Sequence, residues 1–304
     1  MSQPNVPPAV AVSAISQSVT LVATIVALVA FAGNSLLCRL ALRPGGIDPA
    51  TFTGVRLVAG AIVLLAIVVA RRKPAGGPMW GGSWAAAFAL AAYAAGFSWA
   101  YRGMTAGTGA LLLFGSVQTT MVVWAVARGE RPRWTEWCGL TLALAGLAVL
   151  LAPRLAPPPP LNAAAMIVAG VAWGAYSLLG RGTTDPIGAT AGNFLRAALL
   201  ALPGFALGEM NFASIVAGDS AASRGVLLAI ASGAVTSGIG YVIWYVALRG
   251  LSATRAALLQ LSVPILAAIG GVALMGETVT TTLVASTLMV VGGVALAILS
   301  RGRR

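Results

Sequence analysis

The sequence of 304 residues has no histidine, only seven acidic residues and two cysteines. Charged residues make up 9% of the chain, whereas about a quarter of the residues of a soluble domain carry charge. This excludes an ordinary soluble domain. The acids all lie at or beyond the ends of apolar segments, at Asp48, Glu130, Glu136, Asp185, Glu209, Asp219 and Glu277.

These absences also exclude several kinds of site. A metal centre needs clustered His, Cys, Asp or Glu, and nucleophilic catalysis needs a base beside its nucleophile. Neither arrangement occurs, so we predict no catalytic residue, no metal and no cofactor. Proton-coupled carriers place a carboxylate or histidine near the bilayer midplane, and the apolar segments contain none. We interpret the isolated thiols of Cys38 and Cys138 as packing groups.

What the chain does contain is a series of apolar runs of roughly 20 residues, the length that crosses ~30 Å of hydrocarbon. Turn residues and charges separate the runs. The pattern predicts an all-α polytopic membrane protein with ten transmembrane helices. The runs lie near residues 18–38, 50–70, 81–101, 105–127, 134–152, 162–180, 187–207, 225–247, 251–275 and 279–299.

The second half of the chain repeats the first. Each half has five runs, an odd number, so we predict two inverted five-helix repeats, as in many secondary transporters. The predicted boundaries are a tail at 1–17, repeats at 18–152 and 162–300, a proline-rich linker at 153–161 and a tail at 301–304. Matching residues stand 147 apart (Arg102 and Arg249, Gly129 and Gly276, Glu130 and Glu277), 142 apart (Phe31 and Trp173, Ser35 and Ser177, Arg39 and Arg181) or 140 apart (Arg56 and Arg196).

Loop charges predict the orientation. The loops after the even-numbered spans, with the C-terminal tail, hold 12 Lys and Arg, and the other loops hold 5. The positive-inside rule therefore places both termini in the cytoplasm. Basic residues at span ends meet anionic lipid headgroups, so the net charge of +12 requires no nucleic-acid partner. Between the seventh and eighth spans, Gly208 to Ser223 fits either a short helix on the outer membrane surface or a plain loop.

Two basic residues, Arg56 and Arg196, lie inside predicted spans at equivalent positions of the repeat. Either they bind a substrate carboxylate, or each extends to the near interface or caps carbonyls of a neighbouring helix. Their symmetry favours the structural role, because a central substrate rarely needs the same charge from both halves. Glu130 and Glu277 each follow a glycine at a span end, and we interpret them as structural charges at opposite membrane faces.

Uncharged polar and aromatic residues inside the spans form the better candidate for a binding site. The interfacial aromatic belt explains Trp134 and Trp137 near span starts, but not rings seven or more residues inside a span. A buried amide costs several kcal/mol in hydrocarbon unless it is partnered. The predicted substrate-binding residues are Asn34, Tyr93, Phe97, Gln118, Trp173, Tyr176, Ser177, Tyr241, Trp244 and Gln260.

Pro264 lies inside the ninth span and has no N–H to donate to the carbonyl of Gln260. A kink is therefore predicted in this span. The first-half equivalent is Val117, so the kink is not duplicated. We interpret Pro264 as a hinge for alternating access. Gly170 and Gly174 have the spacing of a close helix contact.

Several repeated motifs resemble the EamA-type transporters of the drug/metabolite transporter superfamily. They are an aromatic residue before an Arg in the first span of each half, an Asp-Pro pair followed by an intramembrane Arg, and a Gly-Glu pair closing the fourth span. The stretch LLQLSVPILAAIGGVALMGE, residues 258–277, is similar to that family's most recognisable segment.

The resemblance covers residues 18–300 and implies a central substrate cavity between the repeats, in a bacterial inner-membrane protein. Within the family the chain looks closest to the bacterial exporters of aromatic amino acids, which implies facilitative export. The expected partners are a small-molecule substrate and membrane lipids, with the protein as a monomer. A broad multidrug or metabolite exporter stays open, as does a channel-like or scaffold membrane protein that transports nothing.

Overall fold

The computed structural model describes residues 16–42, 46–71, 81–100, 106–152, 158–206, 220–275 and 278–299. These ranges contain helices and no strands. By length and composition, five helical segments can cross a membrane: Gln17–Ala41, Pro49–Ala70, Pro160–Gly180, Ser220–Leu248 and Ala253–Leu274. Shorter apolar helices accompany them. The predicted all-helical, membrane-spanning class is confirmed for this part of the chain, whereas the number of ten spans and the inverted repeat stay predictions.

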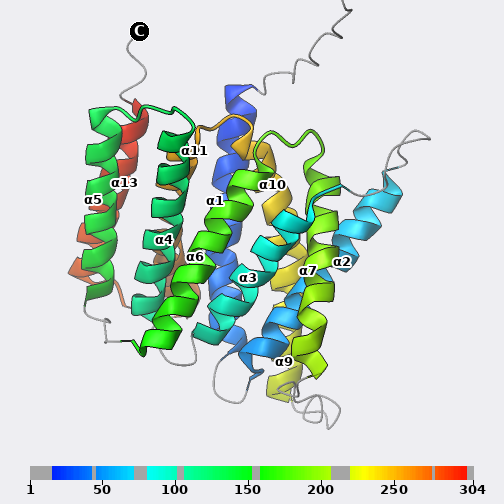
Figure 1. Ribbon diagram of the computed structural model, residues 1–304. Coiled ribbons are helices and arrows are strands. Elements are labelled where there is room, and N and C mark those ends of the chain that lie inside the picture. The colour runs from blue at the N-terminus through cyan, green and yellow to red at the C-terminus, as the bar shows by residue number, and fades with distance from the viewer. Residues whose placement is uncertain are drawn as a thin grey trace, which may run out of the picture.

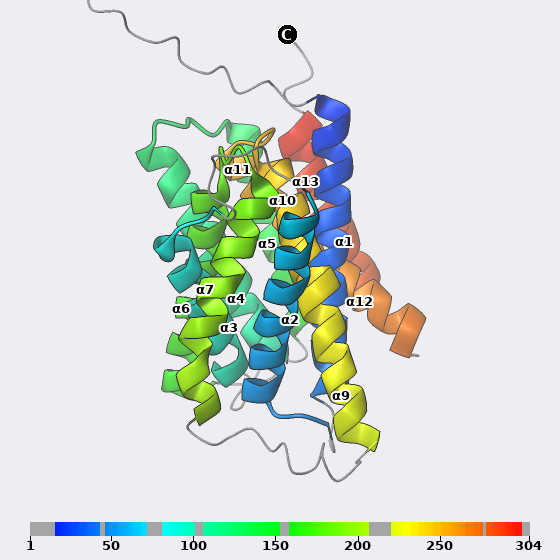
Figure 2. The same ribbon diagram turned by 90° about the vertical axis from the view of Figure 1, so that its right-hand side faces the viewer.

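The chain runs alternately down and up the bundle, with residues 220–248 forming one rod and residues 253–275 another (Figure 1). The first helix begins and the last helix ends at the same end of the bundle, which we call the termini end (Figures 1 and 2). The elements are α1 (Gln17–Ala41), α2 (Pro49–Ala70), α3 (Trp84–Ala100), α4 (Ala106–Ala127), α5 (Trp134–Leu151), α6 (Pro160–Gly180), α7 (Pro186–Ala206), α9 (Ser220–Ala231), η2 (Ser232–Ile239), α10 (Gly240–Leu248), α11 (Ala253–Gln260), α12 (Ser262–Met275) and α13 (Thr281–Leu299).

The repeated Asp-Pro pair starts a helix in each half. The carboxylate of Asp48 accepts hydrogen bonds from the backbone N–H groups of Ala50 at 2.8 Å and Thr51 at 2.9 Å, and Pro49 opens α2. Such capping satisfies N–H groups that have no partner within the helix, and proline is suited to the first turn. Asp185 likewise accepts from the N–H of Gly188 at the start of α7, at 3.1 Å.

The two halves of the chain pack mainly against each other. α2 packs on α7, α5 on α13, α3 on α6, and α1 on α10. Exchanging the halves converts the α3–α6 pair into the α1–α10 pair, so the pattern of contacts repeats as the sequence does. Gly170 and Gly174 on α6 lie against α4, where a Cβ on Gly170 would stand 2.6 Å from the carbonyl oxygen of Leu113. The close contact expected of these glycines is confirmed.

Two of the long helical rods are interrupted. α11 ends at Gln260 and α12 begins at Ser262, so the ninth rod breaks where Pro264 removes a hydrogen bond, as predicted. The second interruption, the π-helical segment η2, was not predicted. It is rich in small residues, and a Cβ on Gly233 would overlap the backbone carbonyl oxygen of Arg56 on α2. Short π segments frequently occur at functional sites.

Some predicted features fall outside the described residues. These are Glu277, most of the segment from Gly208 to Ser223, and residues 1–15, 153–157 and 301–304. Trp134 and Trp137, which were assigned to the interfacial belt, are exposed at the start of α5. Their exposure fits that assignment.

Candidate functional site

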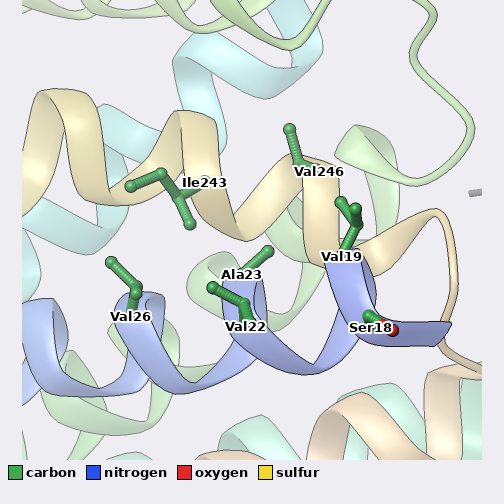
Figure 3. Close-up of a pocket in the computed structure, with 7 residues that line it drawn as sticks. All are labelled: Ser18, Val19, Val22, Ala23, Val26, Ile243 and Val246. Atoms are coloured by element: carbon green, nitrogen blue, oxygen red, sulfur yellow. The ribbon is translucent and has the colours of Figure 1, made fainter. Parts of the chain in front are cut away.

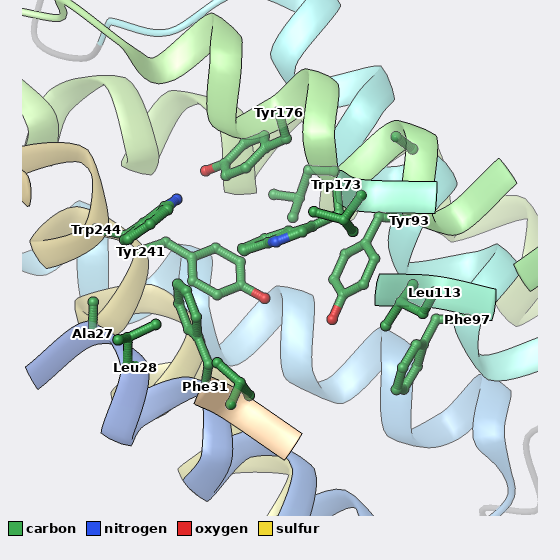
Figure 4. Packing of buried hydrophobic residues seen from close by; sticks show 14 of the residues in the cluster. Ala27, Leu28, Phe31, Tyr93, Phe97, Leu113, Trp173, Tyr176, Tyr241 and Trp244 are labelled. Carbon is green, nitrogen blue, oxygen red and sulfur yellow. The ribbon is translucent and has the colours of Figure 1, made fainter. Parts of the chain in front are cut away.

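Six buried rings from four helices meet at the centre of the bundle, and we call them the aromatic cluster (Figure 4). Trp173 is in the middle, with its ring centroid 4.8 Å from Tyr241, 5.0 Å from Tyr93 and 5.4 Å from Phe31. Each half of the chain contributes two of the helices. The members are Phe31 on α1, Tyr93 on α3, Trp173 and Tyr176 on α6, and Tyr241 and Trp244 on α10.

Five of these rings were predicted as substrate-binding residues, and Phe31 was missed. A signal for Phe31 was present, because it is the repeat equivalent of Trp173, and the two rings touch edge to face. Phe97 extends the cluster along α3, 5.6 Å from Tyr93. Phe194 on α7 was also missed, and its ring lies 5.7 Å from Tyr241.

Predicted polar residues bond to the two indoles of the cluster. The Nε1–H of Trp173 donates to Oε1 of Gln260 at 2.6 Å, and that of Trp244 donates to Oγ of Ser177 at 3.1 Å. Gln118 lies elsewhere: its amide donates to the carbonyl of Ala257 at 2.8 Å and so joins α4 to α11. The structure thus brings Gln260 and Ser177 to the rings and gives Gln118 a bond between helices.

Arg56 lies against the cluster and is only 2% exposed. Its Nε donates to Oγ of Ser237 at 2.8 Å and its Nη2 to the hydroxyl of Tyr241 at 2.5 Å. The guanidinium carbon is 5.6 Å from the centroid of the Tyr93 ring. The two hydroxyls hold the guanidinium of Arg56 inside the bundle, which differs from extension to the interface or capping of a carbonyl.

Arg196, the repeat equivalent, lies in different surroundings. It is half-buried, and its Nη1 donates to the backbone carbonyl of Gly81 at 3.0 Å. Its guanidinium also lies over the ring of Trp84, 5.6 Å from the centroid. Its position therefore fits a structural charge.

Asn34 continues the polar contacts of Arg56. Its Oδ1 accepts from Oγ of Ser232 at 2.5 Å and from Oγ of Ser237 at 3.4 Å. Because Ser237 also accepts from Arg56, a buried chain of hydrogen bonds links α2, η2 and α1. Ser232 and Ser237 were missed, since their position depends on the π winding of η2.

No carboxylate balances the charge of Arg56 among the described residues. Asp48 caps α2, Asp185 pairs with Arg71 at 3.0 Å, and Glu136 accepts from a backbone N–H at the start of α5. Glu130 pairs with Arg181 at 3.5 Å. The central site therefore combines aromatic rings, neutral hydroxyls and amides, and one buried positive charge.

Glu130 belongs to a separate polar cluster at the termini end. Its carboxylate accepts from the backbone N–H of Ala253 at 3.0 Å and from the hydroxyl of Thr254 at 3.1 Å, at the start of α11. Partial burial opposes ionisation, but these hydrogen bonds and Arg181 outweigh it and lower the pKa of Glu130 below its usual range. The geometry fits the predicted structural charge, because a carboxylate stabilises a helix N-terminus.

A groove of about 440 Å³ lies between α1 and α10 on the outside of the bundle (Figure 3). Its lining is almost wholly apolar and offers a metabolite little to bind except hydrophobic contact. It is therefore not the candidate site. The lining residues are Ser18, Val19, Val22, Ala23, Val26, Ile243 and Val246.

Comparison with known proteins gives two matches to one family. The model of the EamA-like transporter family matches residues 18–152 and again residues 161–299. An uncharacterized protein of Pseudomonas aeruginosa is 48% identical over 282 residues, which are 93% of this chain and 95% of that protein. The uncharacterized transporter YwfM of Bacillus subtilis is 27% identical over 244 residues, 78% of this chain and 80% of that protein.

A solved crystal structure has the same fold. It superposes with a TM-score of 0.79, at 22% sequence identity, over 95% of this chain and 100% of that one. At this level of identity the likeness concerns the fold alone.

Proposed function

Because the chain belongs to the EamA-like transporter family, we propose that it exports small amphiphilic metabolites that carry an aromatic ring, above all aromatic amino acids. The observation that carries this proposal is the aromatic cluster, which both halves build at the centre of the bundle. A ring-bearing solute that enters there replaces contacts between the cluster's own rings with contacts of the same kind. Aromatic pairs contribute ~0.5–1.5 kcal/mol each beyond the area they bury.

We place the chain in the bacterial inner membrane as ten spans in two inverted repeats, with both termini in the cytoplasm. The cluster then lies where the repeats meet, which is the position of substrate sites in such transporters. Alternating access rocks one set of helices against the other around this centre. The break between α11 and α12 beside Pro264 offers a place for a rod to bend.

Transport in this proposal is facilitative. The described acids bond at helix ends, and the chain has no histidine, so the spans offer no carboxylate or imidazole to relay a proton. A substrate gradient is therefore sufficient to drive movement.

The test is uptake of radiolabelled L-tryptophan, L-phenylalanine and L-glutamate into proteoliposomes, with and without an imposed pH gradient. We expect saturable uptake of the two aromatic amino acids, little uptake of glutamate, and equal initial rates with and without the gradient. A rate that rises well beyond twofold with an inward proton gradient overturns the facilitative mechanism. Flux that increases linearly without saturation favours a channel-like protein instead.

A broad multidrug exporter is the second candidate, because an apolar aromatic site also accommodates drug-like cations. The buried charge of Arg56 argues against cations as the main substrates. Competition of tryptophan uptake by tetraphenylphosphonium separates the two. Strong inhibition by this cation, with weak inhibition by phenylalanine, supports the multidrug function.

A further inference from the structure

We propose that Arg56 is the carboxylate-recognition group of the transporter, so that its substrates are aromatic compounds that carry a carboxylate. The inference rests on the proposed transport function and adds the substrate class and the residue that selects it. It departs from the symmetry argument, which assigned Arg56 and Arg196 the same structural role.

The first step is the cost of the charge. Arginine inside a membrane protein is costly unless it is paired, and such residues mark substrate or ion pathways. Buried charges are normally matched by an opposite charge or a metal. Arg56 is 2% exposed, and among the described residues its partners are two neutral hydroxyls and the face of a tyrosine ring. The guanidinium therefore has hydrogen-bond partners, but no negative charge beside it in the described part of the chain.

The second step is geometry. Guanidinium presents its N–H groups as a planar fork that binds a carboxylate through two parallel hydrogen bonds. Arg56 already donates to Tyr241, whose ring is 4.8 Å from that of Trp173. A solute whose ring packs against Trp173 and Tyr241, and whose carboxylate is two or three bonds from that ring, therefore places the carboxylate within reach of the guanidinium. On binding, the carboxylate would replace the neutral hydroxyl of Tyr241 as a hydrogen-bond acceptor for Arg56, and it would bring a negative charge.

The alternative role for Arg56 is structural, and we call it a strap: its hydrogen bonds to Ser237 and Tyr241 connect α2 to η2 and α10. A strap affects folding and all ligands alike, whereas a recognition group discriminates between ligands. Arg196 supplies the matched control, because it has the repeat-equivalent position, is half-buried, and bonds to a backbone carbonyl.

The experiment measures binding to the full-length protein in lipid nanodiscs. The probes are L-tryptophan, indole-3-propionate, which keeps the carboxylate, and L-tryptophan methyl ester and tryptamine, which lack it. In the unmodified protein, L-tryptophan and indole-3-propionate should bind at least tenfold more tightly than L-tryptophan methyl ester and tryptamine. In Arg56→Gln, tryptophan should bind about tenfold to a hundredfold more weakly, while the ester changes by less than twofold. Arg196→Gln should preserve the preference.

Each other outcome has a definite reading. If the ester and tryptophan bind equally well to the unmodified protein, the carboxylate inference is overturned and the proposed transport of aromatic solutes stands. If Arg56→Gln weakens all four probes equally, Arg56 is a strap. If no aromatic probe binds or is transported, the proposed function itself fails. Should Arg56→Gln not fold, the comparison of acid and ester in the unmodified protein decides, with Arg56→Lys expected to keep a reduced preference.

Discussion

Arg56 and Arg196 occupy equivalent positions 140 residues apart, yet their surroundings differ completely. Arg56 is buried among hydroxyls and rings, and Arg196 is half-buried against the backbone of Gly81. The Asp-Pro pair, whose Asp lies 8 residues before Arg56 and 11 residues before Arg196, starts α2 and α7 in a similar way. The repeat therefore reproduces helices and their starts, while the binding chemistry arises where the halves diverge.

The divergence lies mainly in the helices around the two arginines. Regular α-helix is interrupted twice in the second half, at η2 and at Leu261 before Pro264. The corresponding helices of the first half, α3 and α4, are regular over Trp84–Ala100 and Ala106–Ala127. Ser237 in the π-helical segment η2 accepts a hydrogen bond from Arg56. The second half, whose helices are interrupted, therefore supplies a hydrogen-bond partner for the charged residue of the first half.

The largest effect should come from removing the space that lets η2 approach Arg56. A Cβ on Gly233 would stand 2.8 Å from both Cα and the carbonyl carbon of Arg56, so Gly233→Ala must push α2 and η2 apart. Overpacking of this kind costs roughly 1–3 kcal/mol. We expect a clearly lowered melting temperature of the purified protein. Gly115→Ala on α4, where no atom lies within 4 Å, should leave the melting temperature equal or higher. Equal melting temperatures for both variants would contradict the close approach.

The next effect concerns rings contributed by both halves. Tyr93→Ala, Trp173→Ala and Tyr241→Ala should each weaken tryptophan binding by roughly 0.5–2 kcal/mol, because each removes an aromatic contact with the solute. Trp134→Ala should not alter affinity, since that ring is 79% exposed at the start of α5. Isothermal titration in nanodiscs measures the difference. Similar losses in all four variants would show that the cluster is not the binding site.

A smaller effect is expected from restoring the broken rod of the second half. Pro264→Ala supplies an N–H that can bond to the carbonyl of Gln260, four residues back. The first-half equivalent, Val117, already has an N–H and lies within the continuous helix α4. We expect maximal tryptophan flux to fall severalfold, with equilibrium affinity unchanged, because a straightened rod favours one access state. Flux and binding are compared in the same preparation. If both are normal in a folded Pro264→Ala protein, the bend is only packing and the hinge lies elsewhere.

The smallest effect concerns Glu130 at the termini end. Glu130→Gln should cost about 0–1 kcal/mol, because the ion pair with Arg181 is partly exposed. The folded state lowers the pKa of Glu130, so its stabilisation is complete above the unfolded value of ~4.3 and disappears as pH falls through the lowered folded value. The difference in melting temperature between the two proteins should therefore be constant from neutral pH to pH ~5 and shrink at lower pH. A difference that grows with acidity contradicts this assignment.

Sequence reasoning predicted what depends on local chemistry. α1 was expected at 18–38 and spans Gln17–Ala41, and the break near Pro264 follows from a missing N–H. Polar atoms that must find partners in an apolar interior also led to Gln260 and Ser177, which bond to the indoles of Trp173 and Trp244.

Features that depend on neighbouring helices were not predictable in this way. The π-helical segment η2 lies against α2 at Gly233, and periodicity does not report which helix lies opposite. The surroundings of Arg56 were not predictable for the same reason, since the hydroxyls that hold it come from residues 181 and 185 positions later in the chain. Phe31 could have been predicted, because it is the repeat equivalent of Trp173. The repeat was used to compare charged residues but not to select aromatic ones.

The contact between α5 and α13 has a consequence for measuring motion. Gly139 and Gly293 face each other so closely that a Cβ on either would overlap the other's carbonyl oxygen, and a Cβ on Gly146 would stand 2.7 Å from the Cβ of Met289. We expect two helices packed this closely, backbone to backbone, to move together. This pair therefore serves as a fixed reference frame within the molecule. Spin labels on its exposed face, paired with labels on α2 or α10, would report the absolute displacement of the helices that surround the solute.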